Sequence, residues 1–139
     1  MSKGIRLSAR LPVKPEVVFR AWLSSRGHTA MTGGKATANA RKGGRFTAWG
    51  KYITGKNLVL KRPSRIVQSW RGSSFRRSDP DSRLEVRIVP AGKSASKITL
   101  IHTKLPRGAE GRLRKGWGSY YLKPMKKYFT KLARKTARR

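Results

Sequence analysis

The sequence predicts an α+β domain in which an antiparallel sheet packs against a long C-terminal helix. Three observations support this fold class. Residues 4–11 alternate apolar and polar side chains, residues 36–104 contain short strand-like runs separated by turns, and residues 107–135 repeat apolar side chains every three or four positions. Because the helix must bury its aromatic stripe, we expect the sheet to curve around it and offer its concave face.

The N-terminal third is expected to supply one strand and short helices. Residues 4–11 (GIRLSARL) predict a half-buried strand. Pro15 suits the first turn of a helix over 15–24. A shorter helical turn is expected at 26–31, and His28 lies in a glycine-flanked stretch where we expect it to be exposed.

A run of about six strands is expected between residues 36 and 104. Glycine pairs or turn residues precede RFTAW and YITGKNLVL, and Gly55 is a candidate bulge. RIVQSW, LEVRIV and KITLIHT follow, with a polar loop at 72–82 after the first of these. Trp49 and Phe75 are candidates for exposed aromatic residues on which a base could stack.

The last helix carries an apolar stripe made of Leu113, Trp117, Tyr121, Met125, Tyr128 and Leu132. Pro124 lies inside this pattern, so a kink is expected there. Gly116 and Gly118 either weaken the helix or allow close packing beside it. The basic tail at 133–139 is expected to be frayed.

Length and composition indicate one domain spanning residues 1–139. No apolar run approaches the roughly 20 residues of a membrane span, and the N-terminus lacks the apolar core of a secretory signal. Cysteine is absent, which excludes disulfides, thiol catalysis and cysteine-based zinc sites. These features fit a cytoplasmic protein.

The net charge is the most unusual feature of the sequence. Lys and Arg number 35 against five acids, which gives a formal charge of +30. The basic residues are spread along the chain, with ten in 1–46, ten in 47–92 and fifteen in 93–139. A small domain typically carries a net charge of about 2–8 in magnitude. Such an excess attracts polyanions and favours a monomer at low salt through self-repulsion.

Five motifs occur together in one order: LPVKPEVVFRAWLS, GGRF, RPSRIVQSW, LEVRIVPAGKSASKITLIHTKLP, and GW before a terminal helix. In this order and spacing they resemble the activator of Hsp90 ATPase homologue 1-like domain, a family of the START-like (SRPBCC) superfamily, over about residues 5–132. The resemblance implies the helix-grip fold, with a seven-stranded antiparallel sheet around the long C-terminal helix. It also implies a hydrophobic cavity between the sheet and the helix.

The resemblance implies no single activity. Members of the superfamily bind lipids or other apolar small molecules, and some catalyse cyclisations. The name-giving co-chaperone engages Hsp90 through a separate N-terminal domain for which this chain has no room, so we do not expect the co-chaperone function here.

The chain departs from the family pattern in its charge. Basic residues stand where the family commonly has acidic or neutral ones, as in Lys61-Arg62-Pro63 and over 107–115. Our hypothesis is that the surface was rewritten by design and that the protein is a recombinant, positively supercharged variant of a cytoplasmic parent. The alternative is a natural, very basic member that associates with nucleic acid or binds a small molecule.

The cavity walls are expected to consist of aromatic residues with a few polar groups. The candidates are Trp22, Met31, Phe46, Gln68, Trp70, His102, Trp117 and Tyr121. His102 has two interpretations, a packed strand histidine or an acid/base or ligand-orienting group in the cavity. Gln68 needs a hydrogen-bond partner if it is buried.

No catalytic motif or pair of carboxylates indicates an enzyme, and neither a metal nor a cofactor is expected. Glu85 is expected to face outward, and an enzyme using His102 is the weakest alternative. We expect non-specific binding of nucleic acids, anionic proteins or other polyanions. The candidate residues are Lys61, Arg62, Arg65, Arg76, Arg77, Lys123, Lys126, Lys127, Lys131, Arg134 and Lys135. Membrane insertion is not expected.

Overall fold

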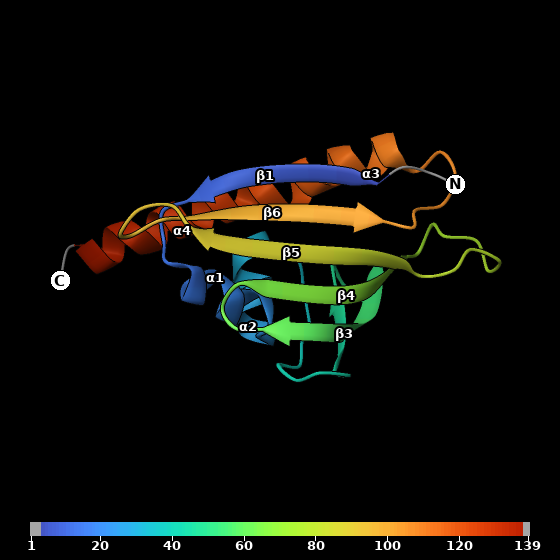
Figure 1. The fold of residues 1–139 in the computed structure, drawn as a ribbon, viewed down its shortest axis with the longest axis horizontal. Helices are drawn as coiled ribbons and strands as arrows, with labels where there is room; N and C mark the ends of the chain where they lie inside the picture. Colours follow the sequence, from blue (N-terminus) through green and yellow to red (C-terminus); the bar gives the residue numbers. More distant parts are fainter. Residues whose placement is uncertain (1–3, 138–139) are drawn as a thin grey trace.

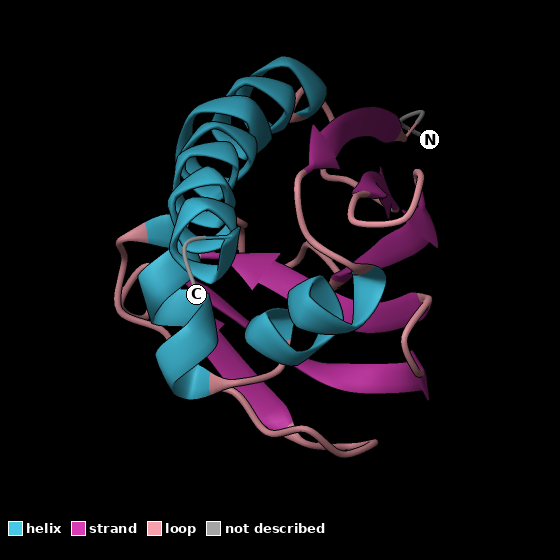
Figure 2. Ribbon diagram, turned by 90° about the vertical axis from the view of Figure 1, so that its left-hand side faces the viewer, coloured by secondary structure: helices cyan, strands magenta, loops and turns pink. Residues whose placement is uncertain are grey.

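The computed structural model describes residues 4–137 and has the expected α+β architecture. A curved antiparallel sheet forms one layer, and the helices cover its inner face (Figures 1 and 2). The strands are β1 (Ile5–Leu11), β2 (Arg45–Ala48), β3 (Ile53–Lys61), β4 (Arg65–Gly72), β5 (Ser82–Pro90) and β6 (Ser96–Thr103). The helices are α1 (Pro15–Trp22), α2 (Ser25–Thr32), α3 (Glu110–Trp117), the π-helical turn η1 (Gly118–Leu122) and α4 (Lys123–Ala137).

The sheet pairs the first strand of the chain with the last one. Its strand order is β1-β6-β5-β4-β3-β2, so the first strand pairs with the last, with Ile5 opposite His102. Alternation along the strands points one set of side chains at the helices, and on β5 this set is Leu84, Val86 and Ile88, all fully buried. The opposite face carries Glu85 and the arginines around it.

Residues 4–137 form six strands, so the expectation of about seven was wrong. Residues 36–44 contribute an isolated bridge between Thr37 and Thr47 in place of a strand. The side chain of Asn57 explains why the ladder stops, because its amide donates to the backbone carbonyls of Asn39 and Arg41 at 2.6 and 3.0 Å. Those carbonyls are therefore satisfied without a neighbouring strand.

Gly55 lies in a regular part of the ladder between β3 and β4, while the register shifts between Asn57 and Val59. The bulge is therefore not at Gly55. This position needs glycine for another reason, since a Cβ there would lie 1.9 Å from the carbonyl oxygen of Ser69 and 2.7 Å from the ring of Phe46. Gly55 thus leaves room for the Phe46 ring to cross the strand.

The C-terminal helical segment changes pitch before Pro124. Proline lacks an N–H and its ring collides with the carbonyl four residues earlier, so an ordinary α-turn cannot pass through it undisturbed. Here the chain forms η1, and the N–H of Lys123 reaches the carbonyl of Gly118, five residues back. The expected irregularity is thus a π-turn. Helix α4 continues to Ala137, and residues 138–139 lie outside the described residues.

None of the helices within residues 4–137 combines the length and the apolar character needed to cross a membrane.

Candidate functional site

A pocket of about 410 Å³ lies between the β2–β3 turn and the segment formed by α3 and η1. A volume of this size falls in the range typical of small-molecule sites. Six of the ten lining residues are aromatic, and the lining consists of Trp49, Tyr52, Ile53, Trp70, Arg112, Leu113, Gly116, Trp117, Tyr120 and Tyr121. The site therefore presents flat apolar surfaces with few polar groups.

The β2–β3 turn directs Trp49 toward this pocket. Trp49 and Gly50 begin the connection between β2 and β3, and both have positive φ, at 49° and 71°. The indole of Trp49 lies over Gly34, where a Cβ would come within 2.4 Å of the ring. Its ring centroid is 5.2 Å from that of Tyr120. Trp49 is therefore half-buried at the pocket wall, where the sequence predicted an exposed aromatic.

The helical wall combines aromatic rings with an opening at Gly116. The π-turn brings the rings of Trp117 and Tyr121 to a centroid distance of 4.6 Å. A Cβ added at Gly116 would meet no atom within 4 Å, so the missing side chain leaves free space in the wall. At the mouth, Tyr52 and Tyr120 are 44% and 58% exposed, which is unusual for large aromatic side chains and leaves both accessible to a ligand.

Of the residues predicted to form the cavity, Trp70, Trp117 and Tyr121 line this pocket. The remaining candidates fill the core beside it: Trp22, Met31, Phe46, Gln68 and His102. Gln68 has side-chain partners, since it accepts from the indole N–H of Trp22 at 3.3 Å and donates to Asn57 at 2.8 Å.

Four lining residues of the pocket were not predicted from the sequence: Tyr52, Ile53, Arg112 and Tyr120. The turn at Gly50 was visible in the sequence, and it gave the signal that the flanking Trp49 and Tyr52 lie close together.

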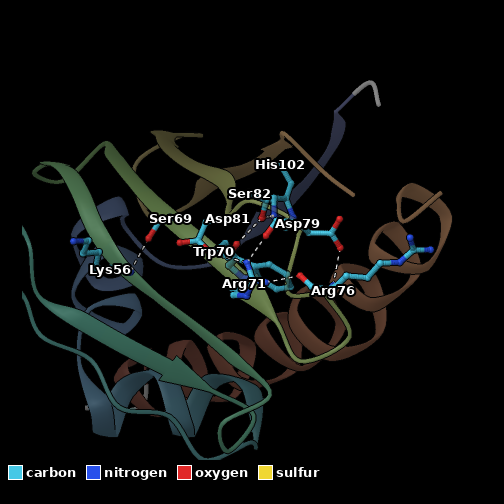
Figure 3. A network of polar contacts seen from close by, with 9 residues as sticks. All are labelled: Lys56, Ser69, Trp70, Arg71, Arg76, Asp79, Asp81, Ser82 and His102. Carbon is cyan, nitrogen blue, oxygen red and sulfur yellow. Dashed lines mark hydrogen bonds and ion pairs between the residues drawn. The ribbon is translucent and has the colours of Figure 1, made fainter. Parts of the chain in front are cut away.

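His102 is a packed strand histidine with both ring nitrogens engaged. Figure 3 shows its contact with Ser82. Its Nδ1 accepts from the indole N–H of Trp117 at 3.0 Å, so the ring proton lies on Nε2, which is 2.7 Å from the hydroxyl of Ser82. That hydroxyl donates in turn to the carbonyl of Trp70. Burial lowers the pKa of His102 to about 3. His102 is therefore a neutral structural group with no free nitrogen.

His28 is buried, so the expectation of an exposed loop histidine was wrong. It lies on α2, where Nδ1 donates to the carbonyl of Trp22 at 2.9 Å and Nε2 accepts from the hydroxyl of Tyr121 at 2.6 Å. The glycines around it allow this close packing, since a Cβ on Gly27 would lie 2.8 Å from the Cα of Ala21. Burial lowers the pKa of His28, against the opposing effect of the Trp22 carbonyl, and burial raises the pKa of the Tyr121 phenol.

Glu85 points to the outer face as expected, but it is buried under arginine side chains. Arg65 and Arg87 stand opposite each other on β4 and β5, and their Nε atoms lie 2.9 and 2.7 Å from the same oxygen of Glu85. Arg83 lies 3.7 Å from the other oxygen. The hydrogen bond from Arg65, aided by that from Arg87 and opposed by burial, lowers the pKa of Glu85 to about 2.

Three further acids make local contacts. Glu16 at the start of α1 pairs with Arg62, and Asp81 pairs with Arg71 at 3.1 Å. Asp79 accepts from the backbone N–H of Arg76, which closes the turn in the polar loop (Figure 3). Four of the five acids thus neutralise a particular arginine or close a turn.

Phe75 in the same loop is also buried, which corrects the expectation that it is exposed. Its exposed fraction is 9%, and its ring packs against Trp70 with centroids 5.8 Å apart. No base could stack on it in this position.

The candidate polyanion-binding residues fall into two groups. Those of the turns and of β4 are partly engaged: Arg62 with Glu16 and Arg65 with Glu85. Those of α4 are exposed, and Lys126, Lys127, Lys131 and Arg134 line a shallow hollow along one side of the helix. We call these four residues the α4 basic patch. No ion pair to them occurs in the part of the chain that the structure describes.

Residues 4–137 contain no group of three or more His, Cys, Asp or Glu side chains that could hold a metal ion.

The curved antiparallel sheet packed on a long C-terminal helix defines a domain of the helix-grip type. Residues 12–130 match the model of the family described as Activator of Hsp90 ATPase homolog 1-like protein. The chain belongs to this family.

Similar proteins carry related descriptions. A relative described as an activator of 90 kDa heat shock protein ATPase homolog, from Dictyostelium discoideum, is 23% identical over 129 residues, which are 93% of this chain and 33% of the relative. The chain thus spans about a third of that relative's length.

Two solved structures show the same fold. An Hsp90 activator from Plasmodium falciparum superposes with a TM-score of 0.80 at 23% identity, covering 88% of this chain and 92% of that one. A protein from Mesorhizobium loti gives a TM-score of 0.78 at 14% identity, covering 93% and 98% of the two chains.

Proposed function

We propose that this chain is a non-enzymatic binding domain that holds an apolar small molecule in the pocket between the β2–β3 turn and α3–η1. The observation that carries this proposal is the aromatic lining, six of ten residues, around a volume of about 410 Å³. Pockets with apolar walls and a few placed polar groups are the usual form of small-molecule sites. The free space at Gly116 and the exposed rings of Tyr52 and Tyr120 give a ligand a way in.

The geometry of His102 supports binding over catalysis. A general base needs a nitrogen within reach of the substrate proton. Both nitrogens of His102 are occupied by Trp117 and Ser82, and His102 does not line the pocket. The carboxylates of Glu16, Glu85 and Asp81 are held by arginines outside it.

The proposal is tested by filling the pocket. We expect the neutral fluorescent probe N-phenyl-1-naphthylamine to bind one site per chain at about 0.5 M salt, where surface charge is screened. In Gly116→Leu the new side chain occupies the free space, so affinity falls about tenfold or more, roughly 1.4 kcal/mol. Leucine favours a helix over glycine by about 1 kcal/mol, so the fold is retained.

The matched control is Gly111→Leu. Gly111 is on the same helix and also has open space around its Cβ position, but it does not line the pocket. Binding by this variant should equal that of the parent chain. Equal binding by both leucine variants, or no saturable binding by the parent chain, would refute the pocket as a ligand site.

A second function rests on a different observation, the α4 basic patch. We propose that nucleic acids and other polyanions bind there without sequence preference. Its cations, spaced along one side of the helix, have no acid partner among the described residues, and the net charge of +30 concentrates anions near the protein. Phosphate contacts release counterions, so the affinity should fall steeply with salt.

This second function is tested by two fourfold variants of equal net charge. One replaces the α4 basic patch by glutamine, and the other replaces four exposed cations elsewhere: Arg41, Lys51, Lys93 and Lys97. We expect the patch variant alone to flatten the plot of log affinity for random double-stranded DNA against log salt, by about 0.9 for each phosphate that the protein no longer neutralises. If both variants change the slope equally, the net charge acts without a defined site.

The hypothesis that the charge was introduced by design rests on the sequence pattern, and the similar proteins neither support nor contradict it. It is independent of both functions, since the pocket and the patch act through the same groups whatever their origin.

A further inference from the structure

Arg112 is the charged residue of the pocket. Among the ten lining residues of the described chain it alone carries a charge, and it comes from the first turns of α3. No hydrogen bond or ion pair to its guanidinium occurs within residues 4–137. An arginine can lay its aliphatic stem along apolar walls and keep its planar charged end free at the mouth. The pocket therefore has an unpartnered cation beside its aromatic rings.

The charge of Arg112 indicates whether a ligand of this aromatic pocket is cationic or anionic. A box of aromatic rings alone would suit a cation, because the ring faces are negative. A guanidinium at the mouth and a net charge of +30 repel a cationic ligand and attract an anionic one. An ion pair formed against apolar walls is also stronger than one in open water, because the local dielectric constant is lower. The balance favours an anion.

The arrangement of the lining rings indicates what the uncharged part of the ligand is. Trp49 and Tyr120 meet edge to face at an interplanar angle of 73°, and Trp117 and Tyr121 are tilted by 54°, so ring faces and edges both line the space. Aromatic rings pack favourably in such stacked and edge-on arrangements. A planar ring system uses these surfaces better than a flexible aliphatic chain, which would also lose more conformational freedom on binding.

We propose that the pocket binds an aromatic molecule that carries one acidic group, a carboxylate or sulfonate, which pairs with Arg112. This inference rests on the proposed binding function and adds the ligand's chemistry. Arg112 acts as a specificity residue: it selects the acidic ligand over its neutral counterpart, while the rings supply affinity for both.

Two probes that share one ring system test the inference. 8-Anilinonaphthalene-1-sulfonate has the rings of N-phenyl-1-naphthylamine plus a sulfonate. At about 0.5 M salt we expect the sulfonate probe to bind more tightly, with both probes competing for one site. In Arg112→Gln this preference should fall about tenfold, while affinity for the neutral probe stays the same.

The control is Arg107→Gln, which lowers the net charge equally at an exposed position outside the pocket. It should keep the preference of the parent chain. If the neutral probe binds but Arg112→Gln keeps the preference, or if both variants lose it equally, the role of Arg112 is overturned and the binding function stands. If neither probe binds a saturable site, the binding function itself fails.

Discussion

Replacing Glu85 by glutamine is expected to destabilise the fold by about 2–3 kcal/mol. The substitution keeps the shape of the side chain but removes the one negative charge that Arg65, Arg83 and Arg87 share. Arg65 and Arg87 are cross-strand partners, and like charges in that position repel. Breaking a fully buried pair costs about 3–5 kcal/mol. The effect here is smaller because the three arginines are between 37% and 50% exposed and water screens them.

Asp81→Asn provides a control with the same change of charge. Asp81 pairs with Arg71, but its side chain is 54% exposed, and such surface pairs contribute about 0–1 kcal/mol. Urea unfolding of both variants should therefore separate them clearly. High salt should restore part of the stability of Glu85→Gln by screening the arginines. Equal stability of the two variants would show that Glu85 contributes no more to stability than an exposed acid such as Asp81.

The fold was predictable because apolar side chains still alternate along the strands and recur every three or four residues in the helices, although most exposed charges are positive. On β5 the apolar residues Leu84, Val86 and Ile88 mark the inner face, regardless of which residues lie between them. The absence of a seventh strand was not predictable in this way, because it depends on where the Asn57 side chain finds acceptors. Such an interaction between distant segments leaves no periodic signal.

The site was predictable only where its residues belong to a regular pattern, which holds for Trp70 on β4 and for Trp117 and Tyr121 on the helical side. Trp117 and Tyr121 belong to a stripe with regular spacing, whereas Trp49 and Tyr120 meet because a turn with positive φ and a π-turn face each other. His28 was misjudged for a related reason. Glycine neighbours usually indicate an exposed loop, but Gly27 serves here to let α2 approach α1. Local composition cannot distinguish a glycine of a turn from one of a close approach.

Acid is expected to destabilise this protein through its two histidines well before its carboxylates are protonated. In the unfolded chain a histidine has a pKa near 6.5, whereas burial lowers the pKa of His102 to about 3 in the folded chain and also lowers that of His28. Between those values the unfolded chain binds more protons, so the free energy of unfolding falls as the pH is lowered.

Between pH 7.5 and pH 5 this linkage amounts to about 2 kcal/mol for His102, with a further decrease from His28. Glu85, whose folded pKa is about 2, adds a decrease only below its ordinary pKa of 4.5. Urea unfolding at a series of pH values above 5 therefore isolates the histidines. Nitrogen NMR of the imidazole should show His102 neutral, with the proton on Nε2, throughout this range.

The hydrogen bonds explain why His102 resists protonation. A second proton would sit on Nδ1 and face the indole N–H of Trp117, placing two donors against each other. In His102→Asn the amide oxygen can accept from Trp117 in place of Nδ1. This variant should be less stable at pH 7.5 because the shorter side chain no longer reaches the hydroxyl of Ser82, yet its stability should fall less steeply toward pH 5. If its pH dependence matched that of the parent chain, the pKa of His102 would be the same in the folded and unfolded chains, and the assignment of His102 as a neutral buried group would be wrong.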